Sequence, residues 1–448
     1  MNTEAPTVPN FRPPQRPGLQ LAAFAAVLVA IVACGGDSPS RRVMLIGIDG
    51  ASPRIVDQLM AERRLPNLAR IARRGVHGTL RSQMPMVSPR IWNTIATGMV
   101  PEKHGILDFS YLGRDRQQHL YVSTDRRART LWSIACYAGF KVGVVNFWNT
   151  YPLEKVNGVM VSDHVLATEI EKLEEMVGVK KTEYGAVIYP DSWNARLSGM
   201  VKNKATPLPN FEDPFRKGQM LPHWVKREEL QRRFVEDGAL ARMTLEISLA
   251  EAPDLTMVLL TGIDRISHYL WSVVEPPDGY SPHLVPTPEG REAGKAALFA
   301  YYEYTDALIG ALASSMGPED LVMVISDHGF EAGESMLHLT GSHFSEKSID
   351  GIIYASGSGI SPASIARDVS VQDITPTLLS WLGLPAAFDM DGIRAAFLEA
   401  DSSAASIPPI KSYDFIALEF VNPSHVPSGV EDEIVEQLRA LGYIDPEE

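Results

Sequence analysis

Cysteine is nearly absent from this chain, which has only two cysteines in 448 residues. One of them, Cys34, lies in an N-terminal segment with the features of a targeting signal, which leaves Cys136 alone in the main body of the chain. A domain held together by intrachain disulfides is therefore excluded, even in an oxidising compartment. The fold must depend on a hydrophobic core, for which 45% hydrophobic side chains are ample.

Basic residues are also few. The chain has 41 Lys and Arg against 55 Asp and Glu, a formal net charge of -14, and Arg-rich stretches such as 70–74 are short. Binding to a nucleic-acid backbone needs clustered positive charge, so no such binding is expected. We also find no internal repeats, and expect one large α/β domain with an insertion.

One apolar run stands out near the N-terminus. Residues 19–33 follow Arg12 and Arg16, which is typical of a signal sequence and short for a membrane span. The run ends in the letters IVAC at 31–34, which resemble a bacterial lipobox. We expect a lipoprotein-type signal peptide over 1–33, a linker over 34–40 and a lipid on Cys34 that tethers the protein to a membrane. An uncleaved signal anchor is the alternative, and both interpretations predict an extracytoplasmic protein of the bacterial cell envelope, periplasmic or on the cell surface.

Short apolar runs alternate with helical patterns over the rest of the chain. A helix is predicted at 52–74, where Leu65, Leu68, Ile71 and Ala72 have the spacing of a buried face. The alternation predicts a parallel or mixed sheet with helices on both faces. The predicted strands are 43–48, 141–146, 159–162, 256–260, 321–325 and 351–355.

A segment rich in prolines, about 167–234, interrupts this alternation before a helical pattern at 228–249. Such an insertion beside a crevice is typical of a substrate cap, and a structural flap is the alternative. We therefore expect a catalytic domain over 41–400 that contains this cap. Residues 401–448 are expected to form a C-terminal extension with a terminal helix.

Acidic residues and histidines follow three of the predicted strands. Asp49 follows 43–48, Asp327 and His328 follow 321–325, and Asp264 lies just after 256–260, with His268 one helical turn further on. The carboxyl ends of parallel strands face one crevice, so these groups are expected to converge there. Singly, each is a common turn former, helix cap or exposed pair. Together they offer oxygen and nitrogen ligands for two divalent metal ions, above all zinc.

A serine near these groups is the candidate nucleophile. Ser88 begins a predicted helix within 87–98, where backbone N–H groups favour a phosphoryl group or an alkoxide. An ordinary helix cap is the alternative role, and Thr94 is a rival nucleophile. His343, in Gly-Ser-His at 341–343, adds one more nitrogen ligand.

These motifs resemble those of the alkaline phosphatase superfamily, specifically its type I phosphodiesterase and nucleotide pyrophosphatase branch. The resemblance runs from 43 to about 392 and rests on Gly-Ile-Asp-Gly at 47–50, the stretch 88–106, 264–268, Ser-Asp-His-Gly at 326–329 and 341–343. It implies an alkaline-phosphatase-like, three-layer α/β/α sandwich with a mostly parallel central sheet and an inserted cap.

The resemblance also implies the division of the site. The family nucleophile stands ten residues before the Gly of Thr-Gly, here Gly98, which selects Ser88 over Thr94. His104 lies in a shared motif but is not a ligand in relatives, so a structural role is expected, and His343 is a better ligand candidate than the nearby His338. By resemblance, one ion is held by Asp49, Ser88, Asp327 and His328, and the other by Asp264, His268 and His343.

We therefore expect a metal-dependent phosphohydrolase that hydrolyses phosphodiesters through a phosphoseryl intermediate on Ser88, with two zinc ions or, alternatively, manganese. Phe109 stands where nucleotide pyrophosphatases carry an Asn that holds a phosphoryl oxygen, which puts a nucleotide substrate in question. Aromatic residues in or near the motifs are candidates for a leaving-group pocket, with core packing as the alternative: Trp92, Phe109, Tyr111 and Trp148.

Two alternatives remain. The first is a phosphomonoesterase or a sulfatase-like hydrolase of the same superfamily. Sulfatases, however, need Pro two and Arg four residues after the modified residue, whereas Pro89 and Arg90 follow Ser88 directly. The second is a noncatalytic surface lipoprotein that binds a phosphorylated ligand.

Overall fold

The computed structural model describes residues 41–113, 116, 118–166, 185–202, 211–335, 339–398, 407–421 and 431–440. Its centre is a nine-stranded sheet with the order β13-β2-β12-β9-β1-β8-β5-β6-β7. Strands β12 and β7 run antiparallel to their neighbours, and the remaining pairs are parallel. The strands are β1 (Val43–Ile48), β2 (Val76–Arg81), β5 (Val142–Val145), β6 (Gly158–Val161), β7 (Ile188–Tyr189), β8 (Leu255–Leu260), β9 (Leu321–Ile325), β12 (Asp350–Ser356) and β13 (Ser364–Ser370).

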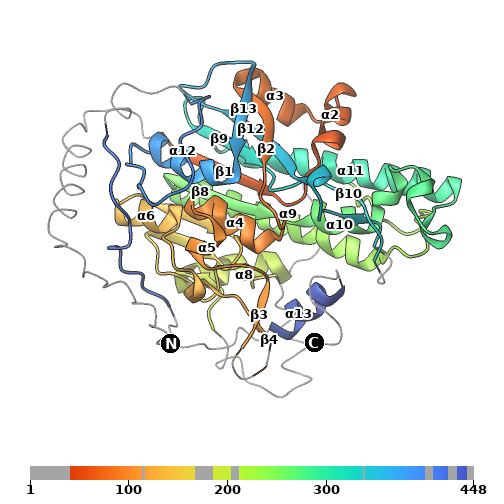
Figure 1. The fold of residues 1–448 in the computed structure, drawn as a ribbon, viewed down its shortest axis with the longest axis horizontal. Coiled ribbons are helices and arrows are strands. Elements are labelled where there is room, and N and C mark those ends of the chain that lie inside the picture. Colours follow the sequence, from red (N-terminus) through yellow and green to blue (C-terminus); the bar gives the residue numbers. More distant parts are fainter. Residues whose placement is uncertain are drawn as a thin grey trace, which may run out of the picture.

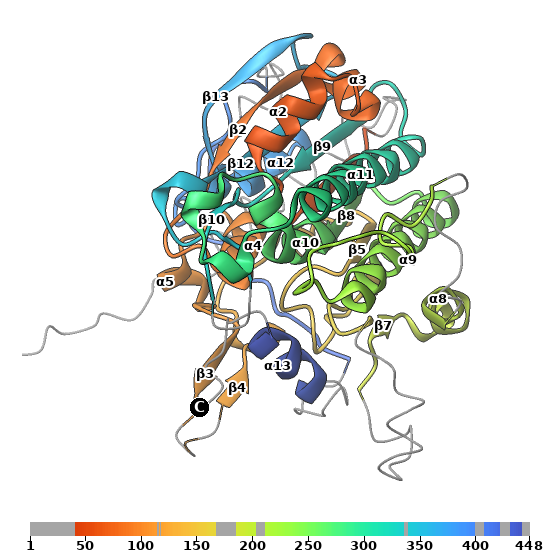
Figure 2. The ribbon, with the colours of Figure 1, turned by 90° about the vertical axis from the view of Figure 1, so that its right-hand side faces the viewer.

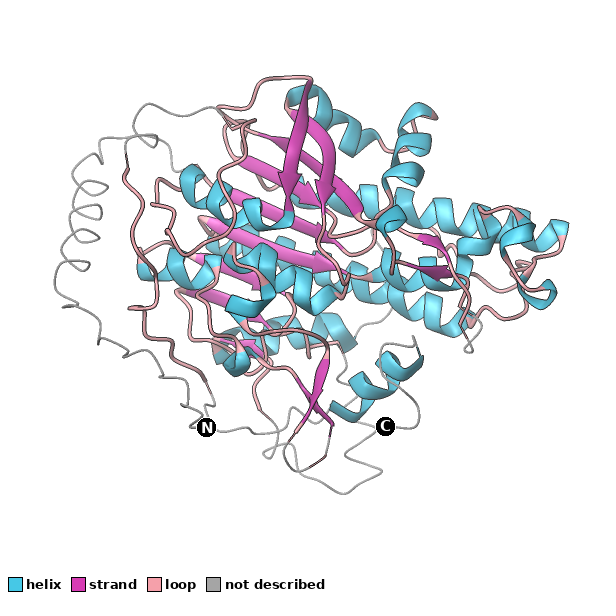
Figure 3. Ribbon diagram, in the orientation of Figure 1, coloured by secondary structure: helices cyan, strands magenta, loops and turns pink. Residues whose placement is uncertain are grey.

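Helices cover both faces of this sheet, as Figures 1 and 3 show. Successive side chains of a strand point to opposite faces, and β1 illustrates the result: Met44 and Ile46 join one buried core, while Val43 and Leu45 join the other. The first core packs against α2 (Pro53–Ala61), α3 (Pro66–Arg74), α9 (Arg227–Glu251), α10 (Gly262–Leu270) and α11 (Pro288–Ala313). The second packs against α4 (Ser88–Thr97), α6 (Leu131–Tyr137) and α12 (Ile374–Trp381).

The predicted three-layer fold with a mostly parallel sheet is thus confirmed, and each predicted strand exists within two residues of its expected bounds. The single helix predicted at 52–74 is wrong, because α2 ends at Ala61 and α3 begins at Pro66. Proline has no N–H to donate within a helix and fits best in its first turn. Strands β2 and β13 were not predicted, since their polar and glycine residues hide the strand pattern.

The smaller elements lie around this body. The short helix α5 (Pro101–His104) follows α4, and two hairpins pair β3 (Ser110–Leu112) with β4 (Gln118–Leu120) and β10 (Glu331–Ala332) with β11 (Gly341–Ser342). In both Figure 1 and Figure 2, the C-terminal helix α13 (Glu431–Ala440) lies beside the β3–β4 hairpin.

The segment interpreted as a cap, 167–234, is described only at 185–202 and 211–234. There, β7 adds an antiparallel edge strand to the sheet and α8 (Asn194–Lys202) contacts α9. The signal peptide and linker predicted at 1–33 and 34–40 lie outside the described residues. Among the helices that are described, none has the length and apolar character needed to cross a membrane.

Candidate metal centre

Adjacent strands of the sheet deliver the predicted ligands to one edge. Asp49 directly follows β1, Asp327 follows β9 after one residue, and α10 begins two residues after β8. Strands β8 and β9 flank β1 as parallel neighbours. Gly50 has φ +70°, and an added Cβ would lie 3.1 Å from the Asp264 backbone, so a glycine is needed where the turn after β1 approaches α10.

The first cluster contains Asp49, Asp327 and His328. His328 Nε2 lies 3.3 Å from Asp49 Oδ1 and 3.5 Å from Asp327 Oδ2. Ser88 joins this cluster, because its hydroxyl donates to Asp49 Oδ1 at 3.2 Å. The backbone N–H of Gly50 donates to the other Asp327 oxygen, Oδ1, and fixes that carboxylate.

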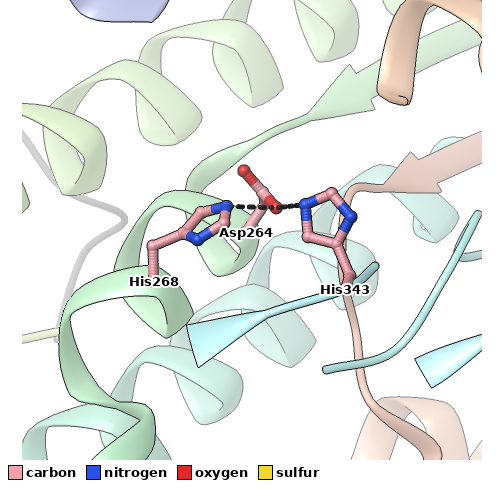
Figure 4. Close-up of side chains that lie close together, drawn as sticks. All are labelled: Asp264, His268 and His343. Atoms are coloured by element: carbon pink, nitrogen blue, oxygen red, sulfur yellow. Dashed lines mark ion pairs between the residues drawn. The ribbon is translucent and has the colours of Figure 1, made fainter. Parts of the chain in front are cut away.

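The second cluster contains Asp264, His268 and His343 (Figure 4). Asp264 Oδ1 lies 3.5 Å from His268 Nε2 and 3.7 Å from His343 Nε2. Asp264 and His268 share one face of α10, and His343 follows β11. Asp237 of α9 secures the start of α10, since its Oδ2 accepts hydrogen bonds from the Gly262 N–H at 3.2 Å and from the Tyr301 hydroxyl at 2.8 Å.

The two clusters are neighbours. The rings of His328 and His343 stack with centroids 3.9 Å apart and an interplanar angle of 19°. The structure therefore brings all seven predicted site residues to one place, and none of them is more than 2% exposed. These residues are Asp49, Ser88, Asp264, His268, Asp327, His328 and His343.

The hydrogen bonds of the imidazoles show which ring nitrogen of each histidine faces the carboxylates. His268 Nδ1 lies 2.9 Å from the Gly341 carbonyl oxygen, and His328 Nδ1 lies 2.9 Å from the Gly329 carbonyl oxygen. A carbonyl only accepts, so each Nδ1 is the donor, and in a neutral ring Nε2 carries a lone pair. Each of these Nε2 atoms faces carboxylate oxygens, so either a proton or a bound cation must lie between them.

The carboxylates give the same indication. Within the described part of the chain, Asp264 Oδ1 and Asp327 Oδ2 accept no hydrogen bond, although both are buried. Imidazole Nε2 atoms lie 3.5 to 3.7 Å from these two oxygens, and a buried carboxylate without a closer partner costs several kcal/mol. Carboxylate oxygens with imidazoles whose other nitrogen is fixed by a carbonyl form the usual surroundings of a bound divalent ion. The residues present therefore fit the two metal ions that the fold implies.

Burial and the charges of neighbouring residues shift pKa values in both clusters. Burial opposes the charged form of His328, but Asp327 and Asp49 outweigh it and raise the pKa of this imidazole to about 10. Burial, followed by the charge of Asp49, raises the pKa of the Asp327 carboxyl well above its usual range. In the second cluster, burial and then His328 keep the pKa of His343 well below its ordinary value. In the absence of metal, the first cluster thus retains protons that a cation would replace.

Ser88 is placed by helix α4, whose first residue it is. Trp92 of α4 packs directly on Gly47 of β1, where an added Cβ would lie 2.6 Å from the indole ring. This close approach brings the start of α4 to the end of β1, next to Asp49. Helix α4 ends at Gly98, whose φ of 69° is the left-handed conformation typical of a helix end.

The rival residues have other roles. The Thr94 hydroxyl bonds to the Arg90 carbonyl, to Gln83 and to His104 Nε2 at 3.1 Å, and no part of it is exposed. Burial, then the charges of Arg126 and Arg90, lowers the pKa of His104 to about 3, so the ring is neutral and structural, as expected. His338 lies outside the described residues.

A pocket adjoins the metal centre, and its lining contains residues that the sequence analysis did not single out. Arg265, next to Asp264 on α10, has its Nε 3.9 Å from Asp264 Oδ2. Asn146 is fixed by a hydrogen bond to the Leu259 carbonyl and also lines the pocket. Neither residue belongs to a recognisable motif, and a strand-end position was the only signal for Asn146.

The aromatic candidates divide between pocket and core. Phe109 and Trp148 line the pocket and pack edge to face, with centroids 5.3 Å apart. Trp92 is a core residue under β1. On the β3–β4 hairpin, Tyr111 stacks with His119, and its ring lies tilted against that of Tyr121, the residue after β4. Phe109 is 3% exposed, and its side chain, which stands at the position of the Asn expected from the resemblance, has no polar atom with which to bind a phosphoryl oxygen.

A three-layer sandwich with acidic and imidazole side chains gathered at the carboxyl edge of its sheet is an arrangement suited to metal-dependent hydrolysis. The profile of the family described as type I phosphodiesterase/nucleotide pyrophosphatase matches residues 43–362. The chain belongs to this family, which is a family of phosphoric ester hydrolases, and the predicted resemblance is confirmed.

Solved structures with similar folds include a phosphonoacetate hydrolase from Sinorhizobium meliloti 1021 in complex with phosphonoformate (19% identity, TM-score 0.40), where the match covers 68% of this chain and 60% of that chain. They also include human ectonucleotide pyrophosphatase/phosphodiesterase 5 (13% identity, TM-score 0.46), where the match covers 77% of this chain and 96% of that chain. The murine counterpart has 11% identity and a TM-score of 0.47, and the match covers 80% of this chain and 98% of that chain. The match thus spans less than two thirds of the phosphonoacetate hydrolase. No curated protein matched the chain significantly.

Proposed function

We propose that this protein is a two-metal phosphodiesterase that acts through a phosphoseryl intermediate on Ser88. The observation that carries the proposal is the set of imidazole Nε2 atoms directed at carboxylate oxygens 3.3 to 3.7 Å away, beside a serine hydroxyl. Such an arrangement is stabilised by divalent cations, and a hydroxyl beside them is a suitable nucleophile.

The ligands divide as the two clusters do. Asp49, Asp327, His328 and the Ser88 oxygen would hold one ion, and the second cluster would hold the other. The mixture of carboxylate oxygen and imidazole nitrogen favours zinc, with manganese as the alternative. When bound, the ions lower the pKa of a coordinated hydroxyl or water and neutralise charge on phosphoryl oxygens.

The residues of the chain then perform the following steps. Asp49 orients the Ser88 hydroxyl through their 3.2 Å hydrogen bond. The Ser88 oxygen loses its proton and forms a bond to phosphorus while the bond to the leaving oxygen breaks, and the leaving oxygen takes up a proton to form the alcohol. A water then attacks phosphorus from the vacated side, the Ser88–phosphorus bond breaks, and Ser88 regains its proton. Because α4 begins at Ser88, its helix dipole would favour the negative charge of a phosphoryl group on this residue.

The pocket supports a diester over a monoester. A phosphodiester retains an ester group on phosphorus during the reaction, and this group needs a site beside the nucleophile. The pocket is such a site, because Pro89, the residue after Ser88, lines it together with Phe109 and Trp148.

The test is hydrolysis of bis-p-nitrophenyl phosphate, p-nitrophenyl phosphate and p-nitrophenyl sulfate with added zinc or manganese. We expect metal-dependent turnover with the diester preferred, abolished in Ser88→Ala and retained within about tenfold in Thr94→Val, which lacks the rival hydroxyl. Preference for the monoester or the sulfate would replace the diesterase assignment. No turnover of any ester would favour the noncatalytic binding protein.

We also propose that the catalytic domain, 41–400, is carried at the cell envelope by a lipid on Cys34. The support is the lipobox-like sequence at 31–34 and the apolar run before it. Expression with a labelled fatty acid should mark the wild-type protein and leave Cys34→Ala unlabelled. Equal labelling of both, or none, contradicts the anchor.

A further inference from the structure

A buried ion pair lies beside the nucleophile helix α4. Arg126, which follows the short 3₁₀ helix Ser123–Asp125, donates from Nη2 to Glu154 Oε1 at 2.7 Å, and the two side chains are only 1% and 4% exposed. The other oxygen of Glu154, Oε2, accepts from the hydroxyl of Ser133 on α6 at 2.6 Å. Helices α6 and α4 pack on the same face of the sheet (Figure 1). Neither member of the ion pair is part of the two metal clusters.

Stability alone does not explain this pair. Removal of two charges from water carries a large desolvation penalty, and apolar side chains of similar volume are often as good or better at such a place. The Arg126 guanidinium also lies over the ring of Trp132, 5.2 Å from its centroid, so an apolar side chain would find suitable neighbours here. The pair is better explained by the groups that it orients.

Arg126 orients the side-chain amide of Asn93, a buried residue of α4. Its Nη1 donates to Asn93 Oδ1 at 3.0 Å and to the Asn149 carbonyl oxygen at 3.0 Å. A guanidinium group only donates, so it determines which end of the Asn93 amide is the oxygen. The amide nitrogen then supplies the remaining bonds, to the Pro89 carbonyl oxygen at 2.8 Å and to Asn149 Oδ1 at 2.7 Å.

The bond to the Pro89 carbonyl secures the first turn of α4. Pro89 directly follows Ser88 and has no N–H of its own to donate. The first N–H groups of a helix have no partner within it, which makes the first turn the part most prone to fray. If the Asn93 amide were reversed, its oxygen would face the Pro89 carbonyl oxygen, and the two acceptors would repel each other.

Asn149 connects this amide to the sheet. It follows β5 with φ of 58°, a left-handed conformation that Asn adopts more readily than most residues. Its backbone N–H donates to Asp163 Oδ2 at 2.8 Å, two residues after β6, and its Nδ2 donates to the Tyr121 carbonyl at 2.6 Å. The ion pair, Asn149 and the first turn of α4 therefore form one connected network.

We propose, resting on the phosphodiesterase function above, that Arg126 is a positioning residue, which acts through Asn93 to hold the first turn of α4 and with it the Ser88 hydroxyl. Glu154 neutralises Arg126 and fixes its direction. The other metal ligands come from β1, β9, α10 and the segment after β11, so loss of the network leaves both ions bound. It lowers the rate of attack by Ser88, because a misplacement of about 1 Å of a reacting group can cost about 10²-fold in rate.

The test removes both charges together, so that neither is left buried without its partner. Arg126→Met/Glu154→Gln keeps an acceptor for Ser133 but leaves the Asn93 amide without the donor that orients it. With whichever p-nitrophenyl ester the wild type hydrolyses fastest, we expect kcat to fall about tenfold or more. KM and the inhibition constant of inorganic phosphate should change less than about threefold, and the metal content should equal that of the wild type.

A matched control carries the same kind of change at the opposite edge of the sheet. Arg42 donates to Asp320 Oδ2 at 2.7 Å where β1 and β9 begin, and Arg42→Met/Asp320→Asn should leave kcat within about twofold. Arg126→Lys keeps a charged donor beside Glu154 and should recover most of the lost kcat. Equal losses of kcat in the two double variants, or a change confined to KM, would overturn the inference.

A single variant tests the same network without disturbing the ion pair. Asn93→Leu has a side chain of similar size without an amide, and the same decrease in kcat is expected, so the test holds even if the double variant fails to fold. Hydrogen exchange of the amides at 91–93, which close the first turn, should also become faster in this variant than in the wild type. Exchange and kcat that both equal those of the wild type contradict the positioning role. Faster exchange combined with a wild type that prefers the monoester, or hydrolyses no ester, would leave the network standing and refute the phosphodiesterase function.

Discussion

The two clusters that could hold metal ions are built in different ways. The first cluster is rich in oxygen, with two carboxylates and the Ser88 hydroxyl around one imidazole. Its Asp and His residues lie within three residues of the ends of the central strands β1 and β9. The second has one carboxylate and two imidazoles, supplied by α10 and the segment after β11. The sheet itself thus fixes the cluster that carries the nucleophile, whereas the other depends on hydrogen bonds that hold a helix and a loop in place.

The largest effect should come from the nucleophile and should leave both clusters intact. Ser88→Ala is expected to lower kcat/KM for bis-p-nitrophenyl phosphate by at least about 10⁴-fold, because no other hydroxyl replaces the attacking oxygen. Metal content measured by elemental analysis should stay at two ions per chain, since three other ligands remain in the first cluster. Loss of an ion together with activity would show that Ser88 mainly holds metal.

Removal of a ligand from the second cluster should lower the activity less than Ser88→Ala does, but it should reduce the bound metal more. His268→Ala is expected to lower kcat/KM by about 10²–10³-fold and to reduce the bound metal to one ion, because the nucleophile and its own cluster remain. Asp327→Asn is the matched change in the first cluster, and it should affect the reaction more strongly for the same loss of one ion. Equal losses of activity in the two variants would contradict the division of labour between the clusters.

The same contrast explains what the sequence alone could predict. Hydrophobic strands have a clear sequence pattern, so the sequence predicts β1, β8 and β9 and places Asp49 and Asp327 at one edge of the sheet. Strand β2, with the sequence VHGTLR, was missed because its pairing with β12 and β13, not its hydrophobicity, makes it a strand.

The second cluster and the pocket were less accessible to such reasoning. His343 is a candidate ligand from its Gly-Ser-His sequence, but only the family resemblance assigns it to the second ion, since no strand pattern places a residue that follows a two-residue hairpin strand. The pocket depends on the packing of α13 over Phe109, some three hundred residues away in the chain. Contacts of this range are set by tertiary structure, and a local pattern contains no trace of them.

Removal of metal should lower the melting temperature by an amount that depends on how many clusters lose an ion. Chelation is expected to lower the melting temperature of the wild type by roughly 5–10 °C, since metal present at a thousand times its Kd contributes about 4 kcal/mol per site. His268→Ala, with one ion left to lose, should show about half of this decrease. Scanning calorimetry with and without chelator measures both, and an unchanged melting temperature in the wild type would contradict bound metal as a structural element.

The smallest effect should come from Asp237, which supports only the second cluster through its hydrogen bond to the start of α10. Burial raises the pKa of this carboxyl to about 7, although the Tyr301 hydroxyl and the Gly262 N–H oppose the shift. Because the folded-state pKa lies above the unfolded value, this group contributes stability that is complete below about pH 4 and is lost as the pH rises through 7. The full shift corresponds to at most about 4 kcal/mol. Relaxation around the charge is expected to reduce this contribution to about 2 kcal/mol.

Asp237→Asn keeps the accepting oxygen but does not ionise, so its free energy of unfolding relative to the wild type should rise between pH 4 and 7 and then level off. Urea unfolding at several pH values tests this, with Glu228→Gln on the exposed side of the same helix as the control. A pH dependence identical to that of the wild type would mean that Asp237 is already charged in the folded protein, and the helix that carries Asp264 and His268 would then be held by an anion.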